Sequence, residues 1–219
     1  MKISRFIWLT AAVAGLALTV RAQSSPMETS RPYNGPGATA IFAGGCFWCI
    51  EQDFEKLPGV LEVESGYTAG WTENPTYESV SFENTGHAEA VKVYYDPDKV
   101  SYAQLVEYFW RHIDPTVKDR QFCDVGTPYR SGIYWQNEAE REVAEASRDA
   151  LVASGRFPVV HTELVPATTF WRAEEYHQDY YKKNPLRYSY YRAACGRDAR
   201  VERLWGDVTG APNGKAGAY

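Results

Sequence analysis

Two cysteines lie three positions apart in the segment GCFWC, and this segment precedes a run with helical spacing. Apolar residues recur every three or four positions after Cys46 and Pro58 ends the pattern, which predicts a helix beginning near Cys46. A sulfur at the start of a helix faces unpaired backbone N–H groups and the positive end of the helix dipole. Both stabilise a thiolate, so we expect the pKa of Cys46 to lie below that of a free cysteine. The sequence therefore predicts a nucleophilic thiol at Cys46.

The residues on either side of this thiol indicate what it reacts with. Gly44 and Gly45 precede Cys46 and let the backbone approach a bound molecule closely. Phe47 and Trp48 follow it and supply an apolar wall. A wall of this kind suits a small, uncharged, apolar reacting group rather than a phosphate or a sugar.

A candidate proton donor, Glu89, lies in the segment HAEAVKVYYDP, which alternates as a strand does. Alternation places Glu89 on the same face as Val91 and Val93, whereas Lys92 points the other way. Burial of a carboxylate on an apolar face raises its pKa, because the charged form loses hydration. We therefore expect Glu89 to be protonated near neutral pH and able to act as a general acid.

Five segments of the chain resemble, in the same order, the signature blocks of peptide methionine sulfoxide reductase of the A type. These segments are GCFWC, GYTAGWTENPTYESV, TGHAEAVKVYYDP, DVGTPYRSGIYW and EYHQDYYKKNP. The resemblance covers about residues 39–206, and several separate motifs in the correct order make it specific.

The resemblance implies a reaction for the residues described above. Methionine sulfoxide presents an S-methyl group, an electrophilic sulfur and a polar oxygen. By resemblance, Cys46 attacks the sulfoxide sulfur and becomes a sulfenic acid while methionine departs. Phe47 and Trp48 would hold the methyl group, and Glu89 would protonate the sulfoxide oxygen. The family also implies selectivity for the S epimer.

The same residue-by-residue match assigns three further polar groups. Tyr77 of NPTYESV and Tyr129 of GTPYRS would donate hydroxyl hydrogen bonds to the sulfoxide oxygen. Asp124 of DVGTPYR would help to orient them.

A second thiol must reduce the sulfenic acid on Cys46. The resemblance favours Cys195, in the segment ACGRD, as the first resolving cysteine, with Cys49 as the alternative in a C-x-x-C pair. Cys123 is either a packed thiol or a second recycling cysteine. The resemblance implies that an external thioredoxin-like donor opens the resulting disulfide, and we expect neither a cofactor nor a metal.

Four other interpretations of the cysteines remain open at this stage. C-x-x-C at a helix start is also typical of thioredoxin-type oxidoreductases, which need no buried acid. A structural zinc site would normally require a second close-spaced pair. The cysteines of an exported protein also pair as structural disulfides, and a secreted binding module would use them only to brace its fold.

The chain is organised around one domain. Residues 1–22 have a basic start, an apolar run and small residues before the boundary at Ala22, which predicts a cleaved secretory signal. Residues 23–38 are predicted to be a linker, 39–206 the catalytic domain and 207–219 a disordered tail. We expect a periplasmic protein, with a membrane-anchored form through an uncleaved N-terminal segment as the alternative.

The net charge of −5 and the absence of a basic run exclude a nucleic-acid footprint. We expect a monomer that acts on peptides or proteins and has no stable association with the membrane. The predicted fold is an α+β or α/β two-layer sandwich, a single domain whose mixed, ferredoxin-like sheet is packed by helices and followed by a long irregular C-terminal coil. Strands are predicted at 39–45, 60–70, 87–97, 131–135 and 157–165, with one helical turn within 74–82 and helices over 46–57, 101–113 and 137–155.

Overall fold

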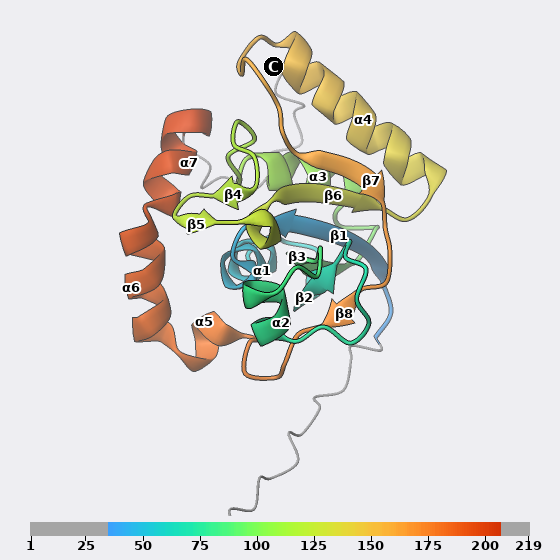
Figure 1. Ribbon diagram of the computed structural model, residues 1–219. Coiled ribbons are helices and arrows are strands. Elements are labelled where there is room, and N and C mark those ends of the chain that lie inside the picture. Colours follow the sequence, from blue (N-terminus) through green and yellow to red (C-terminus); the bar gives the residue numbers. More distant parts are fainter. Residues whose placement is uncertain (1–34, 207–219) are drawn as a thin grey trace, which may run out of the picture.

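The computed structural model describes residues 35–206, which form a mixed six-stranded sheet packed by helices (Figure 1). The strands are β1 (Ala38–Gly44), β2 (Val60–Thr68), β3 (Ala88–Tyr95), β6 (Ser131–Trp135), β7 (Glu163–Pro166) and β8 (Trp171–Arg172). Their order is β7-β6-β1-β3-β2-β8, and β6 and β7 are parallel while the other neighbours are antiparallel. The inner order β6-β1-β3-β2, with one helix after β1 and one after β3, is the predicted ferredoxin-like arrangement.

Three helices build the main core against the sheet, namely α1 (Phe47–Glu55), α3 (Tyr102–Trp110) and α4 (Glu138–Ala153). Phe54 of α1 and Phe109 of α3 both stack on Phe42 of β1, with ring centroids 5.0 and 5.1 Å apart. Side chains cap two of these helices: Ser101 and Gln104 make a reciprocal capping box at the start of α3, and the side chain of Asn137 accepts a hydrogen bond from the backbone N–H of Glu140 in α4.

Short elements cover the end of the sheet at which Cys46 lies. They are α2 (Tyr77–Phe82), the hairpin of β4 (Arg120–Gln121) and β5 (Asp124–Val125), and the 3₁₀ turn η1 (Thr127–Tyr129). Thr76 caps α2 through a reciprocal box with Ser79, so even this six-residue helix begins at a defined residue.

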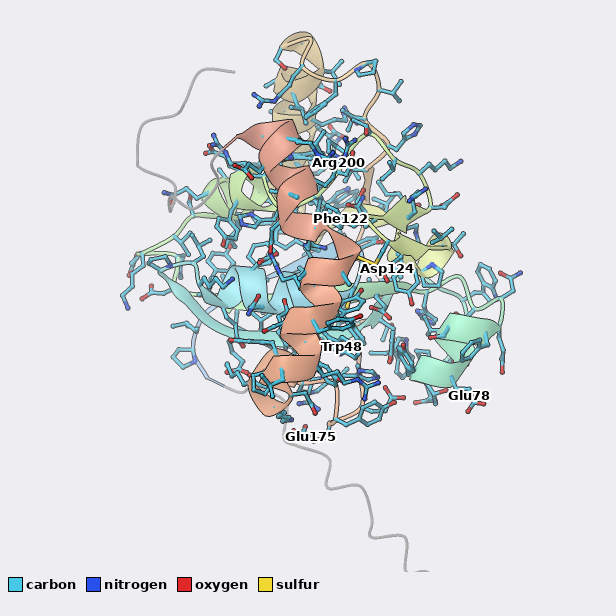
Figure 2. All side chains as sticks on the ribbon, turned by 90° about the vertical axis from the view of Figure 1, so that its left-hand side faces the viewer. Trp48, Glu78, Phe122, Asp124, Glu175 and Arg200 are labelled. Atoms are coloured by element: carbon cyan, nitrogen blue, oxygen red, sulfur yellow. A yellow bond between two sulfur atoms is a disulfide. The ribbon has the colours of Figure 1, made fainter. Side chains whose placement is uncertain are left out.

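The C-terminal part of the domain is helical, so the expectation of an irregular coil there is wrong. Residues 180–205 form α5 (Tyr180–Lys183), α6 (Pro185–Cys195) and α7 (Arg197–Trp205), and Figure 2 shows α6 and α7 in line across one side of the molecule. Pro185 occupies the first turn of α6, and Gly196 at φ 69° ends it. The first two of these helices bury one side chain each, Tyr180 and Tyr188, so their sequences show little of the apolar periodicity that predicts a helix, whereas α7 buries Val201 and Trp205 one turn apart.

One predicted strand is shorter than expected, and the predicted terminal segments lie outside the described residues. The strand predicted over 157–165 pairs only from Glu163, because the preceding residues run as a loop to reach the edge of β6. The signal sequence, residues 23–34 of the linker and the tail 207–219 lie outside the described residues. No helix within residues 35–206 has the length and apolar character needed to span a bilayer.

Candidate active site

A small cavity of about 80 Å³ brings together every residue that sequence analysis assigned to catalysis or substrate binding. It is lined by Cys46, Phe47, Trp48, Tyr77, Glu89, Asp124, Tyr129 and Tyr191. These side chains come from the starts of α1 and α2, from β3, β5 and η1, and from α6. Only Tyr191 was missed by sequence analysis, because the segment that carries it was expected to be irregular.

The turn between β1 and α1 places Cys46 at the mouth of the helix, as its N-cap residue. Gly45 makes this turn with φ 85°, and a Cβ at this position would lie 2.5 Å from Cβ of Gln121. The turn therefore requires glycine. The carbonyl of Cys46 accepts the first helical hydrogen bond, from the N–H of Cys49 at 3.0 Å.

Glu89 is buried on the core face of β3, with 2% of its surface exposed, as strand alternation predicted. The backbone N–H of Phe47 donates a 3.0 Å hydrogen bond to its Oε2. Burial raises the pKa of Glu89 to about 8, and the hydrogen bond from Phe47 opposes this rise only in part. Glu89 is therefore a protonated acid near neutral pH, with a proton that can be transferred.

Two tyrosine hydroxyls complete the polar part of the cavity. Burial raises the pKa of Tyr77 and of Tyr129, and the nearby Glu89 carboxyl adds to both shifts, so both hydroxyls stay protonated and can donate. Glu174 accepts a 2.8 Å hydrogen bond from the backbone N–H of Tyr77 and so holds the start of α2 in place.

Asp124 lies beside these tyrosines but bonds to a different one. The hydroxyl of Tyr191, on α6, donates a 2.7 Å hydrogen bond to Oδ2 of Asp124. Burial raises the pKa of Asp124, against the effect of this hydrogen bond. Asp124 thus fixes the C-terminal helix over the cavity, while its predicted role in orienting Tyr77 and Tyr129 stays a prediction.

The aromatic wall is held by residues that sequence analysis left without a role. Trp48 stacks on Tyr180, with ring centroids 3.7 Å apart and planes 7° from parallel. Its indole N–H donates a 3.0 Å hydrogen bond to Nδ1 of His177, whose pKa burial lowers to about 4. His177 is therefore a neutral acceptor, and its ring also lies 4.9 Å from that of Phe47. His177 and Tyr180 both lie in the segment EYHQDYYKKNP, but the spacing of its residues did not reveal which of them contact Trp48.

The two cysteines of the C-x-x-C segment are both free and buried, and their thiols share a hydrogen bond. Burial raises the pKa of Cys46 well above its usual value, and the neighbouring Cys49 adds to the rise. The expectation of a lowered pKa for Cys46 is therefore wrong for the substrate-free protein. The hydrogen bond from Cys46 lowers the pKa of Cys49 to about 7, with help from the positive charges of Arg197 and Arg192.

Cys123 and Cys195 are joined in a disulfide, with their Cα atoms 5.0 Å apart. Cys123 is exposed and Cys195 is half-buried, so this bond is open to a reductant. The structure thus pairs Cys195 with Cys123 and not with Cys46, and it leaves Cys49 as the thiol in contact with Cys46. Figure 2 shows Asp124 and Phe122, on either side of Cys123, beside the junction of α6 and α7.

A buried thiol, a protonated acid and an apolar wall in one cavity, with a second free thiol beside the first, define a cysteine-dependent oxidoreductase built on a ferredoxin-like sheet. Comparisons with known proteins specify the family. A family model described as peptide methionine sulfoxide reductase matches residues 38–209. The peptide methionine sulfoxide reductase MsrA 2 of Caulobacter vibrioides is 46% identical over 200 residues, which are 91% of this chain and 97% of that protein. The MsrA of Ligilactobacillus salivarius is 54% identical over 69% of this chain and 88% of its own.

Solved structures agree with this match. Methionine sulfoxide reductase A of Corynebacterium diphtheriae superposes with a TM-score of 0.63 at 37% identity, over 70% of this chain and 78% of that one. Mxr1 of Saccharomyces cerevisiae in its reduced form gives a TM-score of 0.64 at 30% identity, over 72% and 91%. The chain belongs to the peptide methionine sulfoxide reductase family.

The burial of Glu89 predicts how stability depends on pH. Its folded pKa of about 8 lies above the unfolded value of about 4.3, so between these limits the folded state binds a proton that the unfolded state has released. Its contribution to stability is therefore complete below about pH 4 and is lost as pH rises through 8. Between pH 5 and 8, the free energy of unfolding of Glu89→Gln should fall by on the order of 3 kcal/mol less than that of the wild type.

Urea unfolding at several pH values measures this difference. The exposed Glu78, at the start of α2, serves as the matched control, and Glu78→Gln should keep the wild-type pH slope (Figure 2). A Glu89→Gln protein with the wild-type slope would show that Glu89 is already ionised at pH 5.

Proposed function

We propose that this protein reduces methionine S-sulfoxide, free or in peptides and proteins, to methionine and so repairs oxidative damage. The observation that carries the proposal is the hydrogen bond that holds protonated Glu89 at the start of the helix bearing the free Cys46. A sulfoxide in this cavity meets a thiol at its sulfur and acidic donors at its oxygen, with its methyl group against the aromatic wall.

In the first step the sulfur of Cys46 attacks the sulfoxide sulfur. Cys49 faces Cys46 as the more acidic thiol, so its thiolate accepts the Cys46 proton as the attack proceeds. Glu89 protonates the sulfoxide oxygen, and Tyr77 and Tyr129 stabilise the charge that develops on it. The oxygen ends on Cys46 as a sulfenic acid, and methionine leaves by two-electron reduction.

In the second step Cys49 resolves the sulfenic acid. Its sulfur displaces the oxygen from Cys46, and a Cys46–Cys49 disulfide forms with release of water. The two protons of this water are those given up by Cys46 and Glu89, so the step balances. Contact between the two thiols favours Cys49 over Cys195, the resolving cysteine that the resemblance favoured.

In the third step the disulfide moves to the surface. A thiolate at Cys195 attacks the Cys46–Cys49 bond, and Cys123 then displaces the remaining buried sulfur. This exchange leaves Cys46 and Cys49 reduced and Cys123 paired with Cys195, which are the oxidation states seen in the structure. An external thioredoxin-like dithiol then reduces the exposed pair.

Turnover of the separated sulfoxide epimers tests the proposed activity. With dithiothreitol as reductant, the wild-type protein should consume the S epimer and leave the R epimer unchanged. Cys46→Ser should be inactive because no nucleophile remains. Glu89→Gln should be slowed about 10²- to 10⁴-fold because it lacks the general acid. Equal loss of both epimers, or full activity in Cys46→Ser, would sink the proposal.

The proposed relay predicts how much methionine forms without a reductant. The fully reduced protein should release about two equivalents per chain, one for each disulfide that can form. A Cys123→Ser/Cys195→Ser double variant should release about one and contain only the Cys46–Cys49 linkage. The methionine released per chain is measured directly, and peptide mapping with a reagent that traps sulfenic acids identifies the linkage. A persistent sulfenic acid in the double variant would place Cys195 first instead.

We further propose that the protein works outside the cytoplasm, in the periplasm. The basic start, the apolar run and the small residues before Gln23 support export. Protein purified from its own cells should therefore begin at Gln23 and separate with the periplasmic fraction. A membrane-bound form that still begins at Met1 would favour the anchored alternative.

A further inference from the structure

Arg197, the first residue of α7, is a buried arginine, with 2% of its surface exposed. Its Nη1 donates a 3.1 Å hydrogen bond to the carbonyl of Gly44, and its Nη2 donates a 2.8 Å hydrogen bond to the carbonyl of His112. Its guanidinium carbon lies 4.4 Å from the centre of the Phe122 ring. Neither the reaction steps above nor the sequence motifs assign a role to this side chain.

The contacts of Arg197 connect the segments that carry the cysteines. Gly44 lies two residues before Cys46, Phe122 directly precedes Cys123, and Arg197 itself lies two residues after Cys195. One planar side chain therefore holds the nucleophile's turn, the loop of the exposed cysteine and the corner between α6 and α7 against one another. Guanidinium suits this position because its fork of donors is rigid and its face stacks on an aromatic ring.

The charge of Arg197 is only loosely neutralised. Asp53 of α1 provides the ion pair that the structure records for it, with Nε 3.5 Å from Oδ2. By contrast, Arg192 of α6 pairs with Asp53 at 2.9 Å and with Asp198 at 2.6 Å. Because the two arginines share the single carboxylate of Asp53, part of the Arg197 charge is left to stabilise another anion nearby. The hydrogen bond from Cys46 lowers the pKa of Cys49 most. Of the two arginines that also lower it, Arg197 has the larger effect.

We propose that Arg197 is a positioning residue for disulfide transfer, which holds the Cys195 corner and the Cys123 loop over the buried thiol pair and stabilises the Cys49 thiolate. The inference rests on the proposed function and refines its second and third steps. The guanidinium forms no bond with the reacting sulfurs. It acts through the carbonyl of Gly44, the ring of Phe122 and its own charge.

Variants at position 197 separate the geometric from the electrostatic contribution. Arg197→Met loses both, so disulfide transfer from Cys46–Cys49 to Cys123–Cys195 should slow about tenfold or more. The pH midpoint at which the buried pair ionises should also rise, as measured by thiolate ultraviolet absorbance in the Cys123→Ser/Cys195→Ser background. Arg197→Lys keeps the charge but not the fork, so its midpoint should stay near wild type while its transfer remains several-fold slower. The exposed Arg203, six residues along the same helix, is the matched control, and Arg203→Met should leave both measurements unchanged.

Quenched-flow peptide mapping after one addition of sulfoxide measures the transfer rate. A general loss of packing would hydrate the thiol pair and so lower the thiolate midpoint, whereas loss of the Arg197 charge raises it, so the titration distinguishes the two effects. Should Arg197→Met fail to fold, a wild-type transfer rate in Arg197→Lys overturns the geometric role. Unchanged transfer and midpoint in a folded Arg197→Met overturn the whole inference. Failure of this inference is distinguishable from failure of the proposed function, which is judged on how the wild-type protein consumes the two epimers and on the activity of Cys46→Ser.

Discussion

The hydrogen bond from the backbone N–H of Phe47 to the buried carboxyl of Glu89 joins the start of α1 to the middle of the sheet. It satisfies one of the unpaired N–H groups that every helix start leaves open, and it does so with a neutral acid instead of water. Because Glu89 lies on the apolar face of β3, its pKa rises to about 8 and it retains a proton. The same contact therefore positions the helix that carries Cys46 and fixes the distance between nucleophile and acid.

The C-terminal helices close the site around this contact. Tyr191 bonds to Asp124, the 174–180 segment supports Trp48, and Arg197 ties the corner after Cys195 to the turn before Cys46. Each link is a polar or stacking contact between segments far apart in the chain. Exclusion of water by these elements accounts for the raised pKa values in the cavity, since burial is their largest cause.

The site requires a nucleophile that is shielded from water and a thiolate near neutral pH, and the two cysteines each meet one of these requirements. A nucleophile enclosed beside an apolar wall loses hydration, so Cys46 holds its proton in the absence of substrate. Cys49 is equally buried, but the hydrogen bond from Cys46 and then the charges of two arginines lower its pKa to about 7, so that the pair ionises near neutral pH. The site thereby keeps the dry surroundings that suit a sulfoxide and still has a thiolate in contact with the attacking sulfur.

The sequence by itself determined the local features of this protein: the helix start at Cys46, the capped helices and the alternation that buries Glu89. These follow from short-range spacing and capping, which neighbouring residues specify. Only the tertiary structure decided the ionisation of Cys46, the partner of Cys195, the helical path of residues 180–205 and the roles of Tyr191 and Arg197. Desolvation, charge and disulfide geometry depend on segments up to 153 residues apart, as between Gly44 and Arg197, and no local pattern encodes their distances.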